Sequence, residues 1–355
     1  MASRNLVLLI GALAIIAIAI IYLESLKPAQ PVAQQDANSK YPKAPELAGI
    51  TGYINAPSNL TIASLQGRVV LIDFWTYSCI NCIRTLPYLN SWHEKYSRDG
   101  LVIIGVHTPE FEFEKDYANV QAAVEKFGIK YAVVLDNNRG TWNAYRNYYW
   151  PRKYLIDADG RIRYDHIGEG GYDETEERIV ALLSEGKNRP LQLNATKAEA
   201  TPVDFSKVKT PELYFGNSYR RAQLGNAPLF LSDGQAFSAS IPQGSLSGNT
   251  PYLEGEWIAL QDSVKLASRQ GAVELLFTAK NVNIVAGSIN STNLTIYIDG
   301  KRVEKQDYCP DAPLGTCKVD RERLYSIVTL PEYGTHRLRI EASGEGFELY
   351  TFTFG

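Results

Sequence analysis

The sequence predicts an α/β domain followed by an all-β sandwich (jelly-roll) domain, with a transmembrane helix at the N-terminus. Three patterns lead to this prediction. A long apolar segment opens the chain, apolar runs then alternate with helical segments, and beyond residue 208 only strand-like runs separated by turn residues remain. The expected division is a signal anchor at 1–27, a linker at 28–46, an α/β domain at 47–187, a second linker at 188–208 and the β-sandwich at 209–355.

The composition sets limits on the function. A chain of 355 residues suits two domains that each bury a core, and the apolar share of 45% and charged share of 21% are ordinary for globular proteins. The net charge is −3, and no basic block with interleaved aromatic residues occurs. Nucleic acid is therefore not an expected partner.

The N-terminal segment predicts a membrane anchor. Leu6 to Leu23 carry no charge and are just long enough to span a bilayer as a helix, with Arg4 before them and Glu24 after them. The apolar run is longer than the roughly 7 to 15 residues usual in a cleaved signal peptide, which is the alternative. We expect a single-pass protein of the cell membrane whose domains lie outside the cytoplasm.

The α/β elements follow from apolar runs and helical periodicity. Continuous apolar runs predict strands buried on both faces, and Ala158-Asp159-Gly160 predicts a hairpin turn. The expected strands are Val69–Trp75, Leu101–His107, Ala132–Asp136, Lys153–Asp157 and Arg161–Ile167, and the expected helices are Cys79–Tyr96, Tyr117–Phe127 and Asp173–Leu183.

Cys79 and Cys82 form a CxxC motif where a strand ends and a helix begins. A thiolate at a helix start is stabilised by the positive end of the backbone dipole, and a second thiol one turn later can close on the first sulfur. Such a motif can also be half of a zinc site, but the chain has no second CxxC and no close histidine pair. We therefore favour a redox-active pair with no metal.

Residues around the motif resemble those of the thioredoxin superfamily. Asp73 lies six residues before Cys79, where that family carries a buried acid, Trp75 matches a family aromatic, and Pro87 matches the proline of the active-site helix. The run from Tyr149 to Asp157 looks like the family's cis-proline segment. The pattern is most similar to the extracytoplasmic TlpA/ResA family and to the soluble part of DipZ proteins, in which Trp75 to Cys82, Trp150-Pro151 and Gly168-Glu169-Gly170 recur.

This resemblance implies roles for the site residues. Asp73 is expected to relay a proton to or from Cys82, and Pro151 to follow a cis bond against Cys79, where it leaves a backbone edge for substrate and keeps metals away. A docking surface for the partner polypeptide is expected from four residues near the sulfurs, namely Trp75, Trp150, Ile80 and Asn81.

The resemblance also implies partners. It favours a reductase of protein disulfides, in processes such as cytochrome c biogenesis, which is reduced again by a CcdA-like membrane protein on a separate chain. No cofactor beyond the Cys79–Cys82 disulfide is expected. Two alternatives stay open. Thr76 and Cys79 match the TxxC of peroxiredoxins, although Ile72 stands where those proteins have proline, and the fold could serve only as the scaffold of a non-enzymatic cell-surface binding protein.

The C-terminal half predicts strands and a structural disulfide. The expected strands are Glu256–Leu260, Val273–Ala279, Leu294–Ile298, Leu324–Leu330, His336–Glu341 and Phe347–Phe354, with a hairpin signal at Asp299-Gly300. This half resembles the carbohydrate-binding-module-like domain of DipZ. Trp257 or Tyr252, if exposed, could stack on a glycan, although core burial or a docking role are alternatives. Cys309 and Cys317 are expected to close a short loop as a disulfide.

Overall fold

The computed structural model describes residues 40–187, 191–192, 196, 203–218, 224–228, 230–303 and 311–355. The expected membrane helix and most of the first linker lie outside these residues. Within the described ranges, no helix is both long and apolar enough to cross a bilayer.

The first half is built on a six-stranded mixed sheet. Its strands lie in the order β1-β4-β3-β2-β5-β6, with β2, β3 and β4 parallel and the other pairs antiparallel. The central strands β2 and β3 are almost wholly apolar and buried, as expected for a sheet covered on both faces. The strand bounds are β1 Gly52–Ile54, β2 Val69–Trp75, β3 Leu101–His107, β4 Ala132–Leu135, β5 Arg152–Ile156 and β6 Ile162–Ile167.

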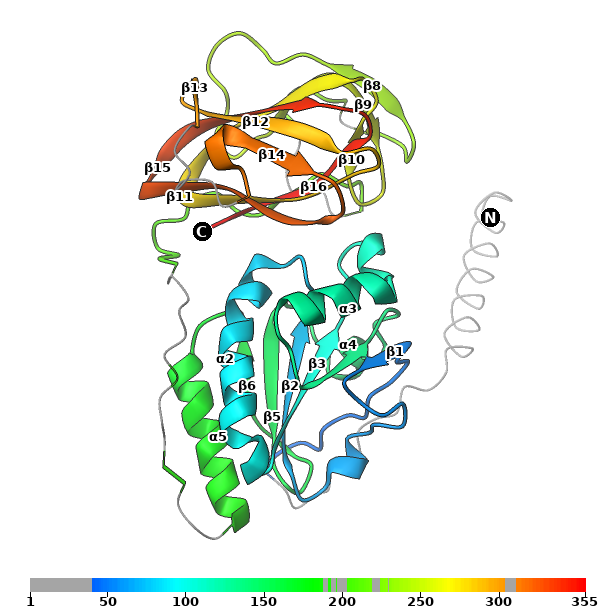
Figure 1. Ribbon diagram of the computed structural model, residues 1–355, viewed down its shortest axis with the longest axis vertical. Coiled ribbons are helices and arrows are strands. Elements are labelled where there is room, and N and C mark those ends of the chain that lie inside the picture. The colour runs from blue at the N-terminus through cyan, green and yellow to red at the C-terminus, as the bar shows by residue number, and fades with distance from the viewer. Residues whose placement is uncertain are drawn as a thin grey trace, which may run out of the picture. The chain divides into compact units, whose positions relative to one another are not determined.

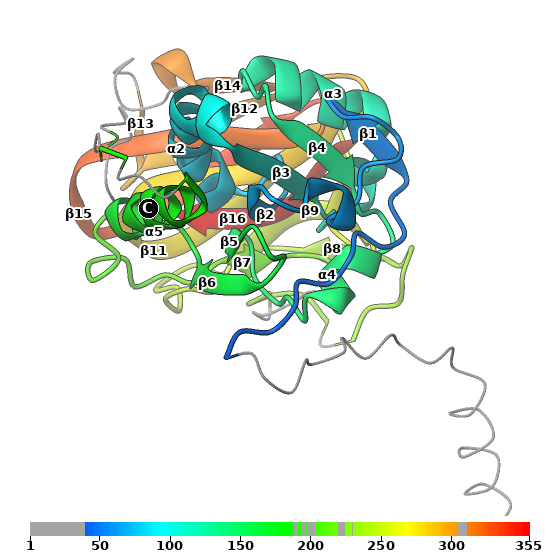
Figure 2. The same ribbon diagram turned by 90° about the horizontal axis from the view of Figure 1, so that it is seen from below.

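Helices pack on both faces of this sheet. Figures 1 and 2 show α2 and α5 side by side on one face. On β2 the odd-numbered residues Leu71 and Trp75 face the core that contains α2, α3 and α5, whereas Ile72 and Phe74 face the core with α4. The bounds are α2 Ile80–Tyr96, α3 Tyr117–Lys126, α4 Gly140–Ala144 and α5 Tyr172–Lys187, with short 3₁₀ turns η1 Ala63–Leu65, η2 Ser97–Asp99 and η3 Glu112–Lys115.

The C-terminal half is all-β apart from one 3₁₀ turn, η5 Pro313–Gly315, in the part of the chain described. Its strands form one hydrogen-bonded network in the order β13-β12-β15-β11-β16-β10-β9-β8, with β14 beside β12 and β7 beside β16. The long strand β11 pairs with β9 along its first half and with β16 along its second. The bounds are β7 Leu213–Tyr214, β8 Ala236–Ala239, β9 Tyr252–Ala259, β10 Val264–Leu266, β11 Gln270–Ser288, β12 Thr292–Ile298, β13 Lys301–Arg302, β14 Thr316–Val319, β15 Arg323–Ser343 and β16 Phe347–Phe354.

One pair of predicted strands is a single strand. The sequence predicts a break around Pro331, but β15 runs through it from Arg323 to Ser343. The register with β11 passes from Thr329 opposite Asn281 to Gly334 opposite Ala279, so Pro331 lies in a bulge. A proline there interrupts no ladder hydrogen bond, which explains why the strand continues.

The predicted glycan contacts are buried. Trp257 is 0% exposed in the core of the β-rich half, and Tyr252 is 7% exposed. The Trp257 indole N–H donates to the Glu254 carbonyl at 3.1 Å, so the polar end of this side chain is satisfied inside the protein. Neither ring is available to stack on a sugar, and the expectation of a glycan site at these two residues is wrong.

The two halves contact each other within one compact unit, Ala44–Gly355. Aromatic residues of the segment that follows β3 meet the β-rich half, with Phe111 and Phe113 at 5.2 and 4.9 Å from the Tyr350 ring. The shared apolar cluster consists of Ile80, Phe111, Tyr214, Val285, Leu324 and Tyr350.

Candidate active site

Cys79 and Cys82 lie at the junction of β2 and α2. Cys79 is the N-cap of α2, and its sulfur accepts a hydrogen bond from the Cys82 backbone N–H at 3.3 Å. Neither thiol forms a disulfide; Cys79 is partly exposed and Cys82 is only 1% exposed. Cys79 can therefore be reached by a partner, whereas Cys82 is shielded from one.

Asp73 lies on the face of β2 that is turned toward α2. Its side chain is 1% exposed, and one carboxyl oxygen has no hydrogen-bond partner in the described part of the chain. Burial raises the pKa of Asp73 from 3.8 to about 7, against the lowering effect of the nearby Lys153 ammonium. Burial also raises the pKa of the Cys82 thiol well above its usual range, and Cys79 and Asp73 raise it further. Asp73 and Cys82 are thus both buried, and the charge of one affects the ionisation of the other.

Lys153 is a site residue that the sequence reasoning missed. It lies opposite Asp73 in the antiparallel pairing of β5 with β2, and its side chain is 0% exposed. Its ammonium donates to the Gly168 carbonyl at 3.2 Å. Burial lowers the pKa of Lys153, whereas Asp73, Cys82 and Glu169 raise it. The available signal was a lysine on the apolar face of a predicted strand.

The Trp150–Pro151 peptide bond is cis, as the sequence predicts. The Pro151 carbonyl accepts a hydrogen bond from the Gly168 N–H at 2.8 Å, and the Trp150 indole donates to the Thr108 carbonyl at 3.0 Å. Arg84 of α2 forms an ion pair with Glu169 at 3.2 Å. The Gly168-Glu169-Gly170 segment, for which the sequence predicts no role, therefore ties the cis-proline loop to the active-site helix.

The expected docking surface is only partly present. Trp75 is 0% exposed and packs edge-on against His107, so it is a core residue and cannot contact a partner. Ile80 is also buried, because the β-rich half covers it. Trp150 and Asn81 remain partly exposed. Asn81 lines a cavity of about 350 Å³ whose other walls are Phe205, Val208, Lys209, Thr210, Pro211, Glu212 and Phe354.

Polar residues beside the thiols form a buried network. The Thr76 hydroxyl lies 3.3 Å from His107 Nε2, and burial lowers the pKa of His107 to about 3, which keeps this ring neutral. The Ser78 hydroxyl donates to Glu114 at 2.5 Å. In the described residues, no group of three or more His, Cys, Asp or Glu side chains is arranged as metal ligands.

The second cysteine pair is described only in part. Cys317 is buried on β14 at 0% exposure, whereas Cys309 lies outside the described residues. The disulfide between them stays a prediction.

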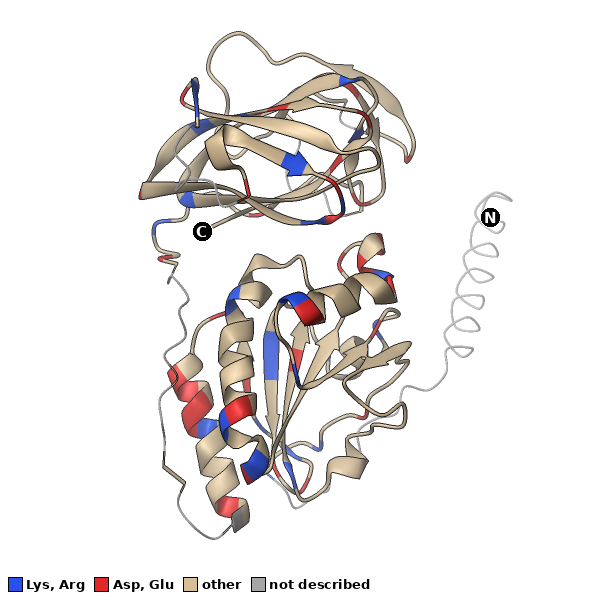
Figure 3. Ribbon diagram, viewed as in Figure 1, with Lys and Arg blue, Asp and Glu red and all other residues tan. Residues whose placement is uncertain are grey.

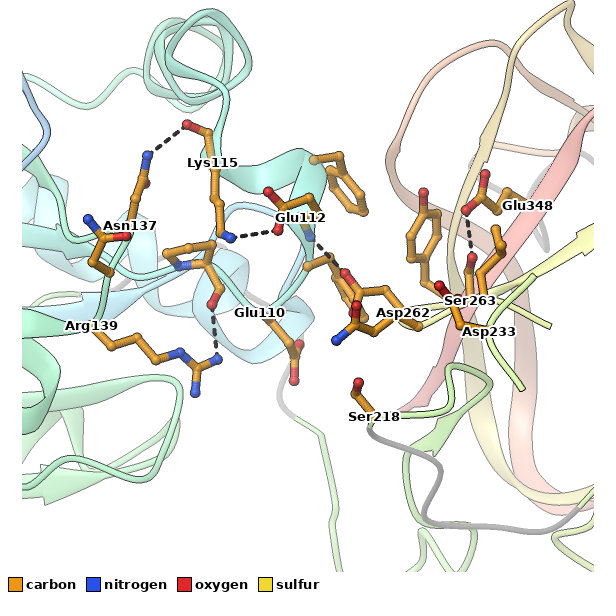
Figure 4. Close-up of a pocket in the computed structure, with 17 residues that line it drawn as sticks. Glu110, Glu112, Lys115, Asn137, Arg139, Ser218, Asp233, Asp262, Ser263 and Glu348 are labelled. Atoms are coloured by element: carbon orange, nitrogen blue, oxygen red, sulfur yellow. Dashed lines mark hydrogen bonds and ion pairs between the residues drawn. The ribbon is translucent and has the colours of Figure 1, made fainter. Parts of the chain in front are cut away.

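A larger cavity of about 600 Å³ lies between the segment that follows β3 and the β-rich half (Figure 4). Both acidic and basic side chains line this cavity, and the Glu112 N–H donates a hydrogen bond to the Asp262 carboxylate at 3.0 Å across it. In Figure 4, Arg139, Lys115, Glu110 and Glu112 lie on one side of the cavity, and Ser263 and Glu348 lie on the other. Neither cysteine lines this cavity, so it is not the site of sulfur chemistry.

Each half of the chain matches a known protein family. Residues 38–183 match the redoxin family, and residues 210–355 match the family described as thioredoxin like C-terminal domain. Protein DipZ of Mycobacterium tuberculosis is 37% identical over 317 residues, covering 88% of this chain and 43% of DipZ. Thiol-disulfide oxidoreductase YkuV of Bacillus subtilis is 30% identical over 40% of this chain and 94% of its own length. Thiol-disulfide oxidoreductase ResA of Bacillus thuringiensis is 28% identical over 35% of this chain and 66% of its own length.

These matches confirm the thioredoxin-like first half and the β-rich second half. The chain spans less than half the length of the DipZ proteins that it matches.

Proposed function

Because this chain belongs to the thioredoxin-like TlpA/ResA family of thiol-disulfide oxidoreductases, we propose that it reduces disulfide bonds in partner proteins. One observation carries the proposal. A partly exposed thiol caps a helix, and a buried thiol one turn later lies beside a buried acid. This arrangement suits an attacking thiol followed by a resolving thiol.

The reaction proceeds in two exchanges. The Cys79 thiolate attacks one sulfur of the partner disulfide, which breaks that bond, forms a mixed disulfide and releases the other partner sulfur as a thiolate that takes up a proton. The Cys82 sulfur, once deprotonated, attacks Cys79 and releases the second partner sulfur in the same way. Two electrons pass to the partner, and Cys79 and Cys82 end as a disulfide.

Asp73 serves the second exchange as a general base. Its pKa of about 7 is matched to accepting a proton near neutral pH, which is where a general base works best. Cys82 needs such help because burial holds its thiol in the protonated form. Lys153 stabilises the ionised Asp73 from the neighbouring strand.

The setting of this reaction belongs to the same proposal. The apolar segment at Leu6 to Leu23 supports a membrane anchor with the domains outside the cytoplasm. In that place the Cys79–Cys82 disulfide is reduced by a CcdA-like membrane electron donor. The β-rich half is a jelly roll that acts as a spacer or as a docking module for protein partners.

Turnover of a protein disulfide tests the function. The full chain should reduce insulin with dithiothreitol as the electron source, and Cys79→Ala should abolish the reaction. Cys82→Ser should accumulate mixed disulfides with its partners in cells, because the resolving thiol is gone. A dithiol that stays bound to metal, or that passes no electrons to insulin or glutathione disulfide, contradicts the proposal.

A further inference from the structure

The cavity at Asn81 connects the thiol motif to the C-terminal half. Asn81 is the second residue after Cys79, the N-cap of α2, so it lies about 3 Å further along the helix axis. It forms one wall of the cavity of about 350 Å³, which we call the Asn81 cavity. The other lining residues belong to segment 205–212 or, in the case of Phe354, to the end of β16.

Contacts on either side of Asn81 join the two halves at this cavity. Ile80 packs in an apolar cluster with residues of the β-rich half. Arg84, one turn further along α2, donates a hydrogen bond to the Asn81 side-chain oxygen at 3.4 Å. Its guanidinium lies against Gly355, the residue that follows Phe354. The Asn81 cavity is therefore built from residues of both halves.

Hydrogen bonds to β11 fix the wall that segment 205–212 supplies. The Lys209 N–H donates to the Thr278 carbonyl at 3.0 Å, and the Thr278 N–H donates to the Thr210 hydroxyl at 2.7 Å. The Thr210 hydroxyl in turn donates to the Asn249 side-chain oxygen at 2.7 Å. A wall that is already ordered in the free protein loses little conformational entropy when a ligand binds to it.

The open part of this wall is apolar. Its two charged side chains, Lys209 and Glu212, have opposite signs, and each forms a hydrogen bond with a residue two or three positions away in the chain. Phe205 is 52% exposed, which is unusual for a large apolar side chain beside a cavity. The apolar lining residues are Phe205, Val208, Pro211 and Phe354.

We propose, on the basis of the proposed function, that the Asn81 cavity receives a large apolar side chain next to the cysteine of the partner polypeptide. The partner disulfide has to reach the Cys79 sulfur, and successive residues of an extended chain advance by about 3.3 Å. A neighbour of the partner cysteine therefore comes within reach of a cavity that begins two residues from Cys79. An apolar side chain gains free energy by leaving water for such walls. The preferred substrates are polypeptide disulfides flanked by residues such as Phe or Leu, and the C-terminal half forms part of the substrate site.

Reduction of symmetric peptide disulfides in a single turnover tests the proposal. The peptides carry Phe or Ala directly before the cysteine, or directly after it, and each is mixed with the prereduced full chain. Each second-order rate constant is divided by that of dithiothreitol with the same peptide, which removes differences in intrinsic reactivity. The Phe peptide should react about tenfold faster than the Ala peptide. This preference should occur in one of the two peptide registers only, because the cavity lies to one side of Cys79.

Phe205→Ala removes the exposed aromatic part of the wall. The preference for Phe over Ala should fall from about tenfold to about twofold, and the rate with glutathione disulfide, whose cysteine has no apolar neighbour, should not change. Phe205→Leu keeps an apolar wall and should retain most of the preference. Phe230→Ala is the matched control, because Phe230 is 91% exposed in the same half and does not line the cavity. A tenfold preference that persists in Phe205→Ala overturns the proposal.

Other results identify a different occupant of the Asn81 cavity, and each of them overturns the proposal. If Phe205→Ala reacts faster with every disulfide, a segment of this chain fills the cavity. If the wild-type rate constant falls as the protein concentration rises, a second copy of the chain fills it. A Phe preference that is equal in both registers reflects general hydrophobic adhesion and not a cavity.

The same measurements separate this proposal from the function itself. A prereduced wild type that reduces glutathione disulfide and all the peptides without preference overturns only the role of the cavity. If Phe205→Ala does not fold, as judged by circular dichroism, the comparison of the two registers in the wild type still decides. A prereduced wild type that reduces neither the peptides nor glutathione disulfide contradicts the proposed function instead.

Discussion

Asp73 and Lys153 lie directly opposite each other on β2 and β5, with both side chains buried. Figure 3 shows an acidic band on β2 and a basic band on β5 within the otherwise uncharged centre of the sheet, and Asp73 is the one acid of β2. Lys153 lowers the pKa of Asp73 and Asp73 raises that of Lys153; Asp73 also raises the pKa of Cys82, and Cys82 raises that of Lys153. Under the proposed function, we therefore expect proton release from Cys82 to depend on two side chains that are 80 residues apart in the sequence.

Asp73→Asn should stabilise the reduced protein at alkaline pH and not in acid. The pKa of Asp73 is raised by folding, so the stability that its protonated form provides is full below about pH 4 and is lost as the pH rises through 7. A pKa rise from 3.8 to about 7 corresponds to a gain in unfolding free energy of at most about 4 kcal/mol at alkaline pH. The loss of the interaction between Asp73 and Lys153 in the variant reduces this gain. Urea unfolding at pH 4 and pH 8 measures the difference, and resolution of the mixed disulfide should slow in the same variant.

Asp159→Asn is the control for this change, because Asp159 is an exposed acid in the turn between β5 and β6. Its unfolding free energy should match that of the wild type at both pH values. An Asp73→Asn protein with the same stability gain at pH 4 and pH 8 would contradict the assignment.

Lys153→Met should move the pH profile of insulin reduction to higher pH. The Lys153 ammonium lowers the pKa of Asp73, so its loss should shift the inflection that follows Asp73 by about one unit above 7. Activity at pH 7 should fall severalfold and recover near pH 8.5. Arg152→Met is the control, since that guanidinium pairs with Asp165 at 2.7 Å instead, and an unshifted profile in Lys153→Met would rule out the coupling.

Gly105→Ala should destabilise the first half. Gly105 lies beside Asp73 on β3, and a methyl group there would approach Trp75 Nε1 at 2.9 Å and a Tyr131 ring carbon at 3.3 Å. Overpacking of this kind typically costs about 1–3 kcal/mol, which thermal or urea unfolding would detect. Gly186→Ala in α5 meets no atom within 4 Å and should instead stabilise by about 0.5–1 kcal/mol. Equal effects of the two substitutions would refute the packing argument.

Trp150→Phe should weaken the binding of protein substrates without slowing the chemistry. The partly exposed indole is fixed by its hydrogen bond to Thr108 and by Arg139, whose guanidinium carbon lies 5.1 Å from the ring centroid. With insulin we expect KM to rise about threefold to tenfold at constant kcat, and with glutathione disulfide no change. Phe230→Ala, at an exposed position of the C-terminal half, is the control. An equal loss with both substrates would show that Trp150 acts on the thiols and not on docking.

Local patterns in the sequence were enough to predict the centre of the site. Three features depend only on neighbouring residues: the strand that ends just before Cys79, the helix that starts there, and the proline that follows an aromatic residue. The structure has all three. The buried strands of the first half were equally predictable, because a short continuous apolar run is typical of a strand that is covered on both faces of a sheet.

Contacts between distant segments were not predictable in this way. Lys153 meets Asp73 because of the register between β2 and β5, and Glu114 meets Ser78 because a turn after β3 folds back over the thiol loop. The burial of Ile80 depends on contact with a different half of the chain. Residue type alone could not decide for Trp75 whether an aromatic side chain near the sulfurs lies on the surface or in the core.

The burial of Ile80 restricts the surface at which partner proteins can bind beside Cys79. Ile80, which directly follows Cys79, packs in an apolar cluster with residues of the chain's own C-terminal half. Under the proposed function we therefore expect the electron donor and the electron acceptor to use the same remaining surface beside Cys79. We therefore expect the two proteins to bind one at a time, without a ternary complex. Steady-state rates should then follow a double-displacement pattern, with parallel reciprocal plots, and an excess of either protein should inhibit its counterpart competitively.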